Sequence, residues 1–278
     1  MESLKVGDVT AAELKNYMED RQEKSYLLVD VREPKEYRMG HIPGAVLLPL
    51  KEVEAGITGL ADADRDLFFY CRSGRRSKIA ANLVADLGVP ARKIYNVSGG
   101  ILAWQGKKLP DFPRLHHFDA AGDVLTILQK ALELEKGTGI FYTVCAGLLE
   151  DKDISAKARA LADFETVHAK VIYRCMKRLK PDLEEFEKMF ERASGEIMEG
   201  GLSVHDAVKG LAAMEEEPCI NFAEMALEIE FTAYDLYRNL ATKAEDRESV
   251  GTLLMLSEQE KGHIRIVANI LSACLKEG

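Results

Sequence analysis

The sequence predicts an α/β domain, built on a mainly parallel sheet with helices on both faces, followed by an all-α four-helix bundle. In the first part, short apolar runs alternate with helical patterns, which is typical of strands buried in a parallel sheet. After residue 118 come four long helical segments without internal proline, and such segments pack as a bundle. The chain has 278 residues, which is long enough for two domains of ordinary size.

The elements of the first part follow from local patterns. Strands are expected at four short apolar runs, Tyr26–Val31, Val46–Leu48, Leu67–Tyr70 and Ile94–Val97. A helix is expected over residues 10–20, because Thr10 and Glu13 have the spacing of a capping box. A second helix is expected over residues 77–87, where Gly88 ends it.

The second part begins after a proline-containing segment without helical or strand periodicity. Residues 107–118, KKLPDFPRLHHF, contain two prolines and no periodicity, so we expect the domain boundary there. The predicted domains are residues 1–112 and 118–278. The long helices are expected over residues 119–149, 154–180, 220–241 and 245–276, with shorter helices within 181–214.

The charge of the chain is unevenly distributed. Residues 1–112 hold 17 Lys and Arg against 16 Asp and Glu, so the net charge of −9 comes from the second part. This acidity disfavours nucleic acid as a partner. No run of eighteen apolar residues occurs, so no membrane partner is expected. The amino terminus lacks the apolar core of a signal peptide, and we expect a cytoplasmic protein.

The cysteines point to free thiols. There are five, an odd number, and no CxxC pair occurs among them. This argues against a disulfide framework and against a zinc-ribbon or rubredoxin-type site, and it favours a reducing compartment. Cys145, Cys175 and Cys274 are expected to be buried as small apolar side chains in helices. Cys219, beside Pro218 at the start of a helix, is expected to be an unreactive thiol.

An internal repeat runs through the second part. The segment ALELEKGTGIFY at 131–142 matches ALEIEFTAYDLY at 226–237, and residues 161–172 match 256–267 with the same offset. The shared positions include one lone glutamate and one ExxH pair in each half. These six residues are Glu135, Glu165, His168, Glu230, Glu260 and His263. Side chains three residues apart project from one helix face, so each ExxH pair is directed to one side.

The six residues predict a site for two metal ions. Four carboxylates match two divalent ions in charge, and carboxylate with imidazole suits iron, with manganese or zinc as alternatives. A buried, unpaired carboxylate is costly, and a metal ion removes that cost. The competing interpretation is that each ExxH is a surface coincidence. Two such pairs in register with two lone glutamates favour the metal site.

On these residues, the segment from Phe118 to Cys274 resembles the rubrerythrin-type proteins of the ferritin-like superfamily. The resemblance implies a di-iron bundle that reacts with peroxide or oxygen and forms a homodimer. One departure concerns the family's additional glutamate, in an ExxE pair on the third helix, because Leu227 and Ala233 occupy the matching positions here. Tyr142 and Tyr237, seven residues beyond the lone glutamates, are expected to donate hydrogen bonds beside the metal ligands.

The stretch FFYCRSGRRS at 68–77 predicts a reactive cysteine. Cys71 follows a strand, and a helix begins near Ser77, so the loop between them directs backbone N–H groups inward. Three arginines, Arg72, Arg75 and Arg76, add positive potential that favours the nucleophilic thiolate. Gly74 permits the φ angles of a tight loop. The competing interpretation is a structural cysteine at the end of a strand.

The first domain, residues 1–112, resembles the rhodanese family. The resemblance rests on VDVRE at 29–33, GHIPGA at 40–45, CRSGRRS at 71–77, and Gly99-Gly100 followed by Trp104. It implies that Cys71 accepts sulfur and that the loop from Cys71 to Arg76 cradles an anion. Four residues separate Cys71 from Arg76, as in sulfurtransferases, whereas the related phosphatases have one more. The supporting residues are expected to be Asp30, Arg32, Ser73, Gly74 and Ser77.

The first hypothesis joins both sites in one enzyme. A sulfurtransferase would form a persulfide on Cys71 from thiosulfate or a persulfide donor and pass the sulfur to a thiol. The same chain would carry a di-iron redox centre acting on peroxide or oxygen. A second hypothesis places the chemistry in the bundle and makes the first domain a sulfur-sensing or docking module. A third is a non-catalytic iron-binding protein.

Overall fold

The computed structural model describes residues 4–111, 124–214, 216–244 and 246–277. The chain divides into two compact units. The first comprises Met1–Phe112, Asp235–Lys243 and Leu253–Glu258, and the second Pro113–Tyr234, Ala244–Thr252 and Gln259–Gly278. The predicted boundary at 107–118 lies mostly outside the described residues, and the predicted limits of the two domains stay a prediction.

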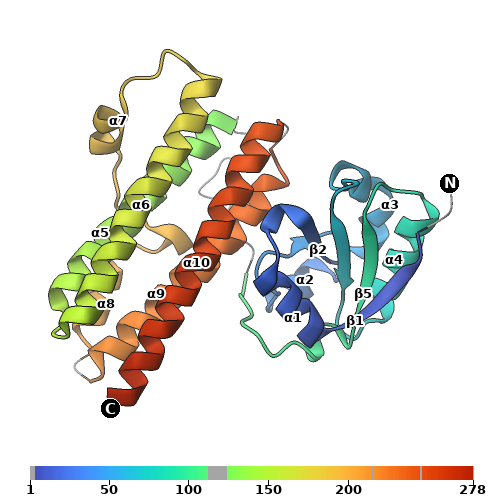
Figure 1. Cartoon of the computed structure of the whole chain (residues 1–278), viewed down its shortest axis with the longest axis horizontal. Helices are drawn as coiled ribbons and strands as arrows, with labels where there is room; N and C mark the ends of the chain where they lie inside the picture. Colours follow the sequence, from blue (N-terminus) through green and yellow to red (C-terminus); the bar gives the residue numbers. More distant parts are fainter. Residues whose placement is uncertain (1–3, 112–123, 215, 245, 278) are drawn as a thin grey trace. The chain divides into compact units, whose positions relative to one another are not determined.

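A five-stranded parallel sheet forms the centre of the first unit. Its strands are β1 (Val6–Thr10), β2 (Tyr26–Asp30), β3 (Val46–Leu47), β4 (Asp66–Tyr70) and β5 (Lys93–Ser98). The order across the sheet is β1-β5-β4-β2-β3, and every described pair is parallel. The parallel sheet is therefore confirmed, with β4 in the middle of the strand order. Figure 1 labels β1, β5 and β2 of this sheet. Strand β1 was not predicted from the sequence, because its residues VGDVT are only partly buried at the edge of the sheet and form no apolar run.

Helices cover both faces of this sheet. They are α1 (Ala11–Asp20), α2 (Pro34–Arg38), α3 (Val53–Gly56) and α4 (Arg75–Asp86). Successive residues of a strand point to opposite faces, so Phe69 packs into one core with α4, and Phe68 packs into another with α1. The expected capping box of Thr10 and Glu13 begins α1. Helix α4 begins two residues earlier than predicted, directly after Gly74.

Four long helices build the second part of the chain. They are α5 (Val124–Leu148), α6 (Lys152–Leu179), α9 (Pro218–Ala241) and α10 (Arg247–Glu277), and Figure 1 shows them side by side. The short helices α7 (Phe186–Arg192) and α8 (Val204–Ala212) lie in the connection between α6 and α9. One core includes Phe141, Leu161, Phe222 and Val267, one from each long helix. Among the described residues, no helix combines the length and apolar character that a membrane span requires.

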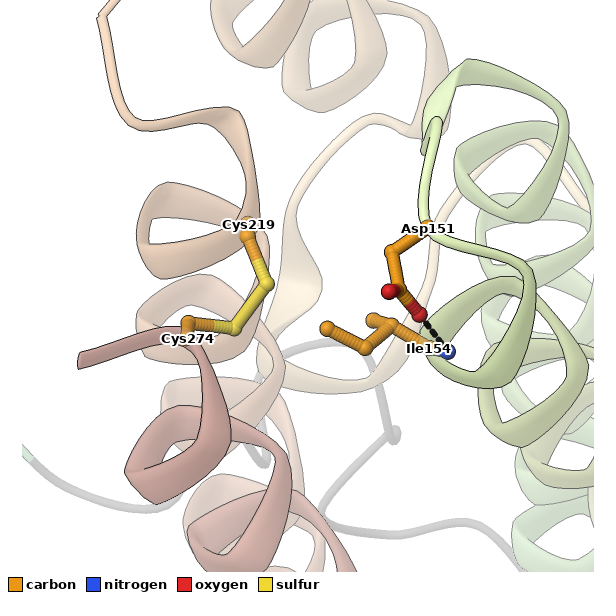
Figure 2. The surroundings of a disulfide bond; sticks show 4 residues. All are labelled: Asp151, Ile154, Cys219 and Cys274. Atoms are coloured by element: carbon orange, nitrogen blue, oxygen red, sulfur yellow. Dashed lines mark hydrogen bonds between the residues drawn. A yellow bond between two sulfur atoms is a disulfide. The ribbon is translucent and has the colours of Figure 1, made fainter. Parts of the chain in front are cut away.

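A disulfide joins two of these helices, contrary to our expectation of free thiols. Cys219 in the first turn of α9 and Cys274 in the last turn of α10 are bonded, with Cα atoms 5.7 Å apart (Figure 2). The prediction that Cys274 is only a small apolar side chain and Cys219 an inert thiol was therefore wrong. The two cysteines are 55 residues apart in sequence, and only the antiparallel packing of their helices brings them together. Cys71, Cys145 and Cys175 are free and buried, as expected.

The disulfide predicts a thiol count. In denaturant without reductant, three thiols per chain are expected to react with an alkylating reagent, and five after reduction. The double substitution Cys219→Ser and Cys274→Ser should lower the free energy of unfolding by about 2–4 kcal/mol, because the cross-link restricts the unfolded chain. Mass spectrometry gives the count, and denaturant unfolding gives the stability. A Cys145→Ala control loses one reactive thiol under both conditions. Five reactive thiols in unreduced protein would show that the two sulfurs are not bonded.

Candidate functional site

Cys71 lies at the carboxyl end of β4, in the middle of the sheet. It follows Tyr70, the last residue of the strand, and is only 1% exposed. Its carbonyl oxygen accepts a hydrogen bond from the N–H of Ile101 at 2.9 Å, and that of Arg72 accepts one from Leu102 at 3.2 Å. The segment after β5 therefore holds the start of the cysteine loop in place.

The loop directs hydrogen-bond donors at the sulfur of Cys71. The Gly74 N–H donates to Sγ at 3.1 Å, and the Ser77 hydroxyl lies 3.5 Å from it. Gly74 has a φ of 93°, which a residue with a side chain rarely adopts, and this conformation turns its N–H inward. Burial alone would raise the pKa of Cys71. The hydrogen bonds from the Ser77 side chain and from the N–H groups of Ser77, Ser73 and Gly74 outweigh it and lower the pKa.

A short polar chain supports Ser77. Its hydroxyl lies 2.7 Å from Oδ1 of Asn96, and Nδ2 of Asn96 donates to Asp8 at 2.8 Å. The hydroxyl carries one hydrogen, so it donates either to Asn96 or to the Cys71 sulfur. A negative sulfur attracts that hydrogen more strongly, so this arrangement favours the thiolate. Asn96, on the neighbouring strand β5, was not predicted as a site residue.

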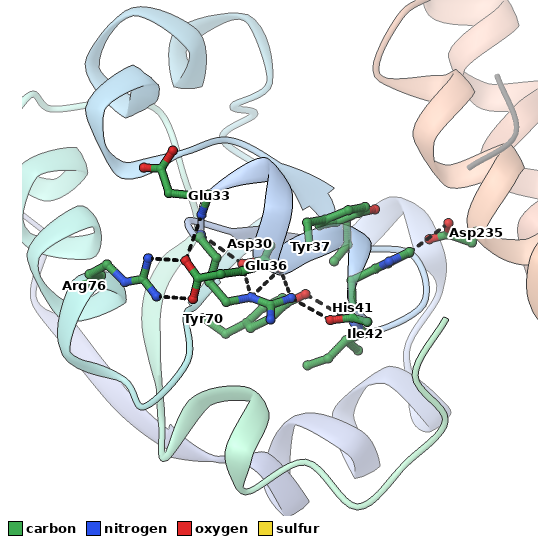
Figure 3. A network of polar contacts seen from close by, with 12 residues as sticks. Asp30, Glu33, Glu36, Tyr37, His41, Ile42, Tyr70, Arg76 and Asp235 are labelled. Carbon is green, nitrogen blue, oxygen red and sulfur yellow. Dashed lines mark hydrogen bonds and ion pairs between the residues drawn. The ribbon is translucent and has the colours of Figure 1, made fainter. Parts of the chain in front are cut away.

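The three arginines of the loop have different surroundings. The side chains of Arg72 and Arg75 are exposed, as is Ser73. Arg76 is engaged by Glu36, with both guanidinium-to-carboxylate distances at 2.7 Å (Figure 3). This pairing lowers the pKa of Glu36 to about 2, chiefly through the hydrogen bonds from Arg76. Part of the positive charge predicted around Cys71 is therefore balanced by Glu36.

Asp30 and Arg32 form a buried pair at the end of β2, the neighbouring strand. The Arg32 guanidinium donates to the Asp30 carboxylate at 2.6 Å and to the carbonyl oxygen of Gly40 at 2.8 Å. Asp30 is fully buried and Arg32 is 5% exposed. The pair connects the strand end to the turn that carries His41, whose ring stacks on Tyr37. This arrangement suits the supporting role expected for both residues.

The six predicted metal residues lie together in the core of the bundle. Glu135 is on α5, Glu165 and His168 on α6, Glu230 on α9, and Glu260 and His263 on α10. All four glutamates have 0% exposure, His168 has 1% and His263 has 4%. Burial of so many ionisable groups in one place excludes the interpretation of the ExxH pairs as surface coincidences.

Their distances follow the internal repeat. Nδ1 of His168 lies 3.4 Å from Glu135, 3.3 Å from Glu165 and 3.0 Å from Glu260. Nδ1 of His263 lies 3.2 Å from Glu230, 3.3 Å from Glu260 and 3.5 Å from Glu165. Each imidazole thus has its own lone glutamate, whereas Glu165 and Glu260 direct one oxygen toward each imidazole. Such an arrangement could hold two metal ions, with Glu165 and Glu260 shared between them.

The electrostatics of these groups fit a metal centre. By geometric criteria, neither carboxylate oxygen of Glu165 or Glu260 accepts a hydrogen bond within the described part of the chain. Burial, with the neighbouring carboxylates, raises the pKa of Glu165 well above its usual value and that of Glu230 to about 7. Burial alone would lower the pKa of His263, but Glu230 and Glu260 raise it to about 10. These shifts favour the protonated forms of the groups in the metal-free cluster, and divalent ions would supply positive charge in place of those protons.

The predicted tyrosine Tyr142 contacts the centre. The Tyr142 hydroxyl donates a short hydrogen bond to Oε1 of Glu230, so the tyrosine of the first half supports the glutamate of the second. Tyr237 is also fully buried, and its role as a donor stays a prediction. One acidic residue was missed altogether. Glu199, in the connection between α7 and α8, lies with Glu135 and Glu165 in a second buried group of possible ligands. It has no counterpart in the repeat, so the pattern could not reveal it.

Comparison with known proteins gives the class of each part. A model of the rhodanese-like domain matches residues 10–107, and the rubrerythrin model matches residues 126–228. A sulfurtransferase of Allochromatium vinosum is 34% identical over 105 residues, which are 38% of this chain and 94% of the relative. Bacillus subtilis YtwF is 34% identical over 107 residues, 98% of its length. For Bacillus subtilis YrkF, 41% identical, the chain covers only 44% of the relative.

Among solved structures, a rhodanese-like domain protein from Staphylococcus aureus is similar to part of this chain. The matched region is 38% of this chain and 99% of the other, with 26% identity and a TM-score of 0.34. The fold and the family matches together define a chain with a rhodanese-like α/β domain followed by a ferritin-like helical region. The chain belongs to the rhodanese family through its first domain and carries a rubrerythrin domain in the same polypeptide.

The Cys71 loop predicts a pH profile. The alkylation rate of Cys71 should rise with a midpoint below the ordinary thiol value of about 8.5, because the loop donors stabilise the thiolate. Ser77→Ala should raise that midpoint and slow alkylation at neutral pH, because one donor is lost. Mass spectrometry of the Cys71 peptide after iodoacetamide pulses measures both. Ser73→Ala is the control, because it keeps the backbone N–H that faces the sulfur. Equal midpoints in wild type and Ser77→Ala would contradict this role for Ser77.

Proposed function

We propose that this protein is a sulfurtransferase that carries sulfur as a persulfide on Cys71, in one chain with a di-iron centre. The observation that carries the first half is the cluster of hydrogen-bond donors around the Cys71 sulfur. The names of the relatives, sulfurtransferase among them, support it. The proposed small-molecule partners are thiosulfate or a persulfide as donor and a thiol as acceptor.

The sulfur step is a double displacement. The Cys71 thiolate attacks the outer sulfur of thiosulfate, the S–S bond of the donor breaks, and sulfite leaves with the electron pair. The product is a persulfide anion on Cys71, which the Gly74 and Ser77 donors stabilise as they do the thiolate. The acceptor thiolate, or cyanide in an assay, then attacks the outer sulfur and releases the Cys71 thiolate. Arg72 and Arg75, both exposed, would attract the anionic donor, and Arg76 would contribute less because Glu36 pairs with it.

The second half of the proposal concerns the bundle. Glu135 and His168 would hold one iron, Glu230 and His263 the other, and Glu165 and Glu260 would join them. Two bound irons would supply electron-transfer chemistry toward peroxide or oxygen. Tyr142 orients Glu230, and the surrounding apolar core limits the access of water. The rubrerythrin match supports this half, and a homodimer through the bundle is part of the proposal.

Sulfur transfer is tested by thiocyanate formation from thiosulfate and cyanide. Cys71→Ser is expected to reduce the rate to background, because a serine hydroxyl cannot form the persulfide. Cys145→Ala is the control, since burial raises the pKa of Cys145 to about 12 and its thiol should take no part. A wild-type protein that forms no thiocyanate and gains no persulfide from any donor would contradict this half. It would favour the alternative in which the first domain senses sulfur or docks a partner.

Metal binding is tested by analysis of the reconstituted protein. Anaerobic loading should give about two irons per wild-type chain. Glu165→Ala should lose most of both, because Glu165 faces both imidazoles. Asp163→Ala, an exposed change on the same helix, should keep both ions. Iron is measured by atomic emission after removal of free metal, and circular dichroism checks the helices. A wild-type chain that binds no iron, manganese or zinc would contradict the metal centre.

A further inference from the structure

A tight turn in the connection between α7 and α8 places Glu199 inside the bundle. Ile197 and Ser203 form an antiparallel bridge, and the N–H of Met198 donates to the carbonyl oxygen of Leu202 at 2.9 Å. Glu199 follows Met198 near the tip of this turn, and both residues have 0% exposure. A turn between surface helices normally exposes a charged side chain at its tip, so this burial needs a cause.

The turn packs directly on α5, the helix of Glu135. A Cβ atom at Gly137 would lie 2.2 Å from the carbonyl oxygen of Ile197, so only glycine permits this close approach. Beside it, Thr138 accepts a hydrogen bond from the N–H of Glu199 at 3.1 Å. The Thr138 hydroxyl in turn lies 3.5 Å from the Glu199 carboxylate. Gly137 and Thr138 together therefore hold Glu199 against the face of α5 that carries Glu135.

The Glu199 carboxylate lies among other buried carboxylates. One oxygen each of Glu135, Glu165 and Glu199 falls within a group whose members are at most 4.8 Å apart. Three carboxylates at such distances repel one another strongly in a buried site. Independently, both oxygens of the fully buried Glu165 accept no hydrogen bond within the described residues. A cation between the three carboxylates would account for both observations.

We propose that Glu199 is a seventh protein ligand, for the metal ion that Glu135 and His168 hold; this rests on the di-iron centre proposed above. Oxygen ligands lie about 2.1 Å from such an ion, so two of them are at most about 4.2 Å apart. The observed group therefore needs only a small contraction to bind one ion.

The ligand makes the two metal positions unequal. The repeat pairs Thr138 with Ala233, which has no hydroxyl to hold a similar turn. Glu199 lies between the two repeated segments, so the offset of the repeat gives it no counterpart at the second position. The position of Glu135 and His168 would therefore have one more anionic ligand than the position of Glu230 and His263. Two distinguishable binding steps follow from this difference.

The test measures Co²⁺ binding to the metal-free full-length chain by visible absorption. Glu199→Gln should weaken one of the two steps about ten- to a hundredfold and leave the other unchanged. Gly137→Ala should reproduce this effect, because its Cβ displaces the turn. Since alanine favours helix over glycine, a loss cannot be attributed to a weaker α5. Glu196→Gln, an exposed change on the same connection, is the control.

Thermal unfolding separates a ligand from a structural residue. For a ligand, Glu199→Gln leaves the metal-free melting temperature unchanged or raised, because a buried charge is removed, and reduces the rise that Co²⁺ causes. A lower metal-free melting temperature with an unchanged rise would overturn the inference. The inference would also be overturned if Glu199→Gln bound Co²⁺ as tightly as wild type while Glu165→Ala lost both ions. That result would leave the proposed metal centre intact. A wild-type chain that binds no metal would overturn the metal centre and this inference together.

Discussion

The helical part of the protein depends on one electrostatic constraint, the burial of acidic side chains around two imidazoles in an apolar core. Glu135, Glu165, Glu230 and Glu260 all have 0% exposure. Each buried charge costs stability unless opposite charge or hydrogen bonds compensate it. The internal repeat meets this constraint by placing matching groups on α5 with α6 and on α9 with α10. The apolar residues of the bundle then pack around these carboxylates and imidazoles, whose mutual attraction and repulsion determine where they lie.

The connection between the two halves breaks this symmetry. On one side, Thr138 and the turn at Glu199 add a carboxylate beside Glu135. The repeat gives this turn no counterpart beside Glu230. An additional anionic ligand stabilises the more highly charged state of a bound iron. The proposed centre would therefore hold two irons with unequal preferences for oxidation, although the helices that carry them are copies of one pattern.

In the α/β part, the cysteine loop relies on hydrogen bonds more than on net charge. The Gly74 N–H and the Ser77 hydroxyl approach the Cys71 sulfur, and their hydrogen bonds offset the burial that disfavours a thiolate. Arg76 is paired with Glu36, so its charge is partly neutralised. Donors that belong to the backbone and to a buried serine are already oriented before a substrate binds. Such preorganisation suits a site that must stabilise first a thiolate and then a persulfide.

The sequence by itself determined most of the architecture and led to both proposed sites. The short apolar runs predicted the buried strands, because a strand that is buried on both faces needs apolar residues at consecutive positions. The repeat predicted the six metal residues, because the same spacing on two similar helices directs the matching side chains to the same helix face. The sequence also predicted the reactive Cys71 and its loop, because the strand, Gly74 and the start of the helix are adjacent in the chain. All of these signals lie within one helix, one strand or one loop, or recur at a fixed offset.

Only the tertiary structure decided the contacts between distant segments. The Cys219–Cys274 disulfide joins helix ends that are 55 residues apart, and an odd cysteine count gave no sign of it. The pairing of Arg76 with Glu36 and the hydrogen bond from Ser77 to Asn96 likewise cross between elements. Glu199 reaches the centre because Gly137, some sixty residues earlier, leaves room for its turn. Local patterns carry no information about such approaches, because they depend on how whole helices and strands pack.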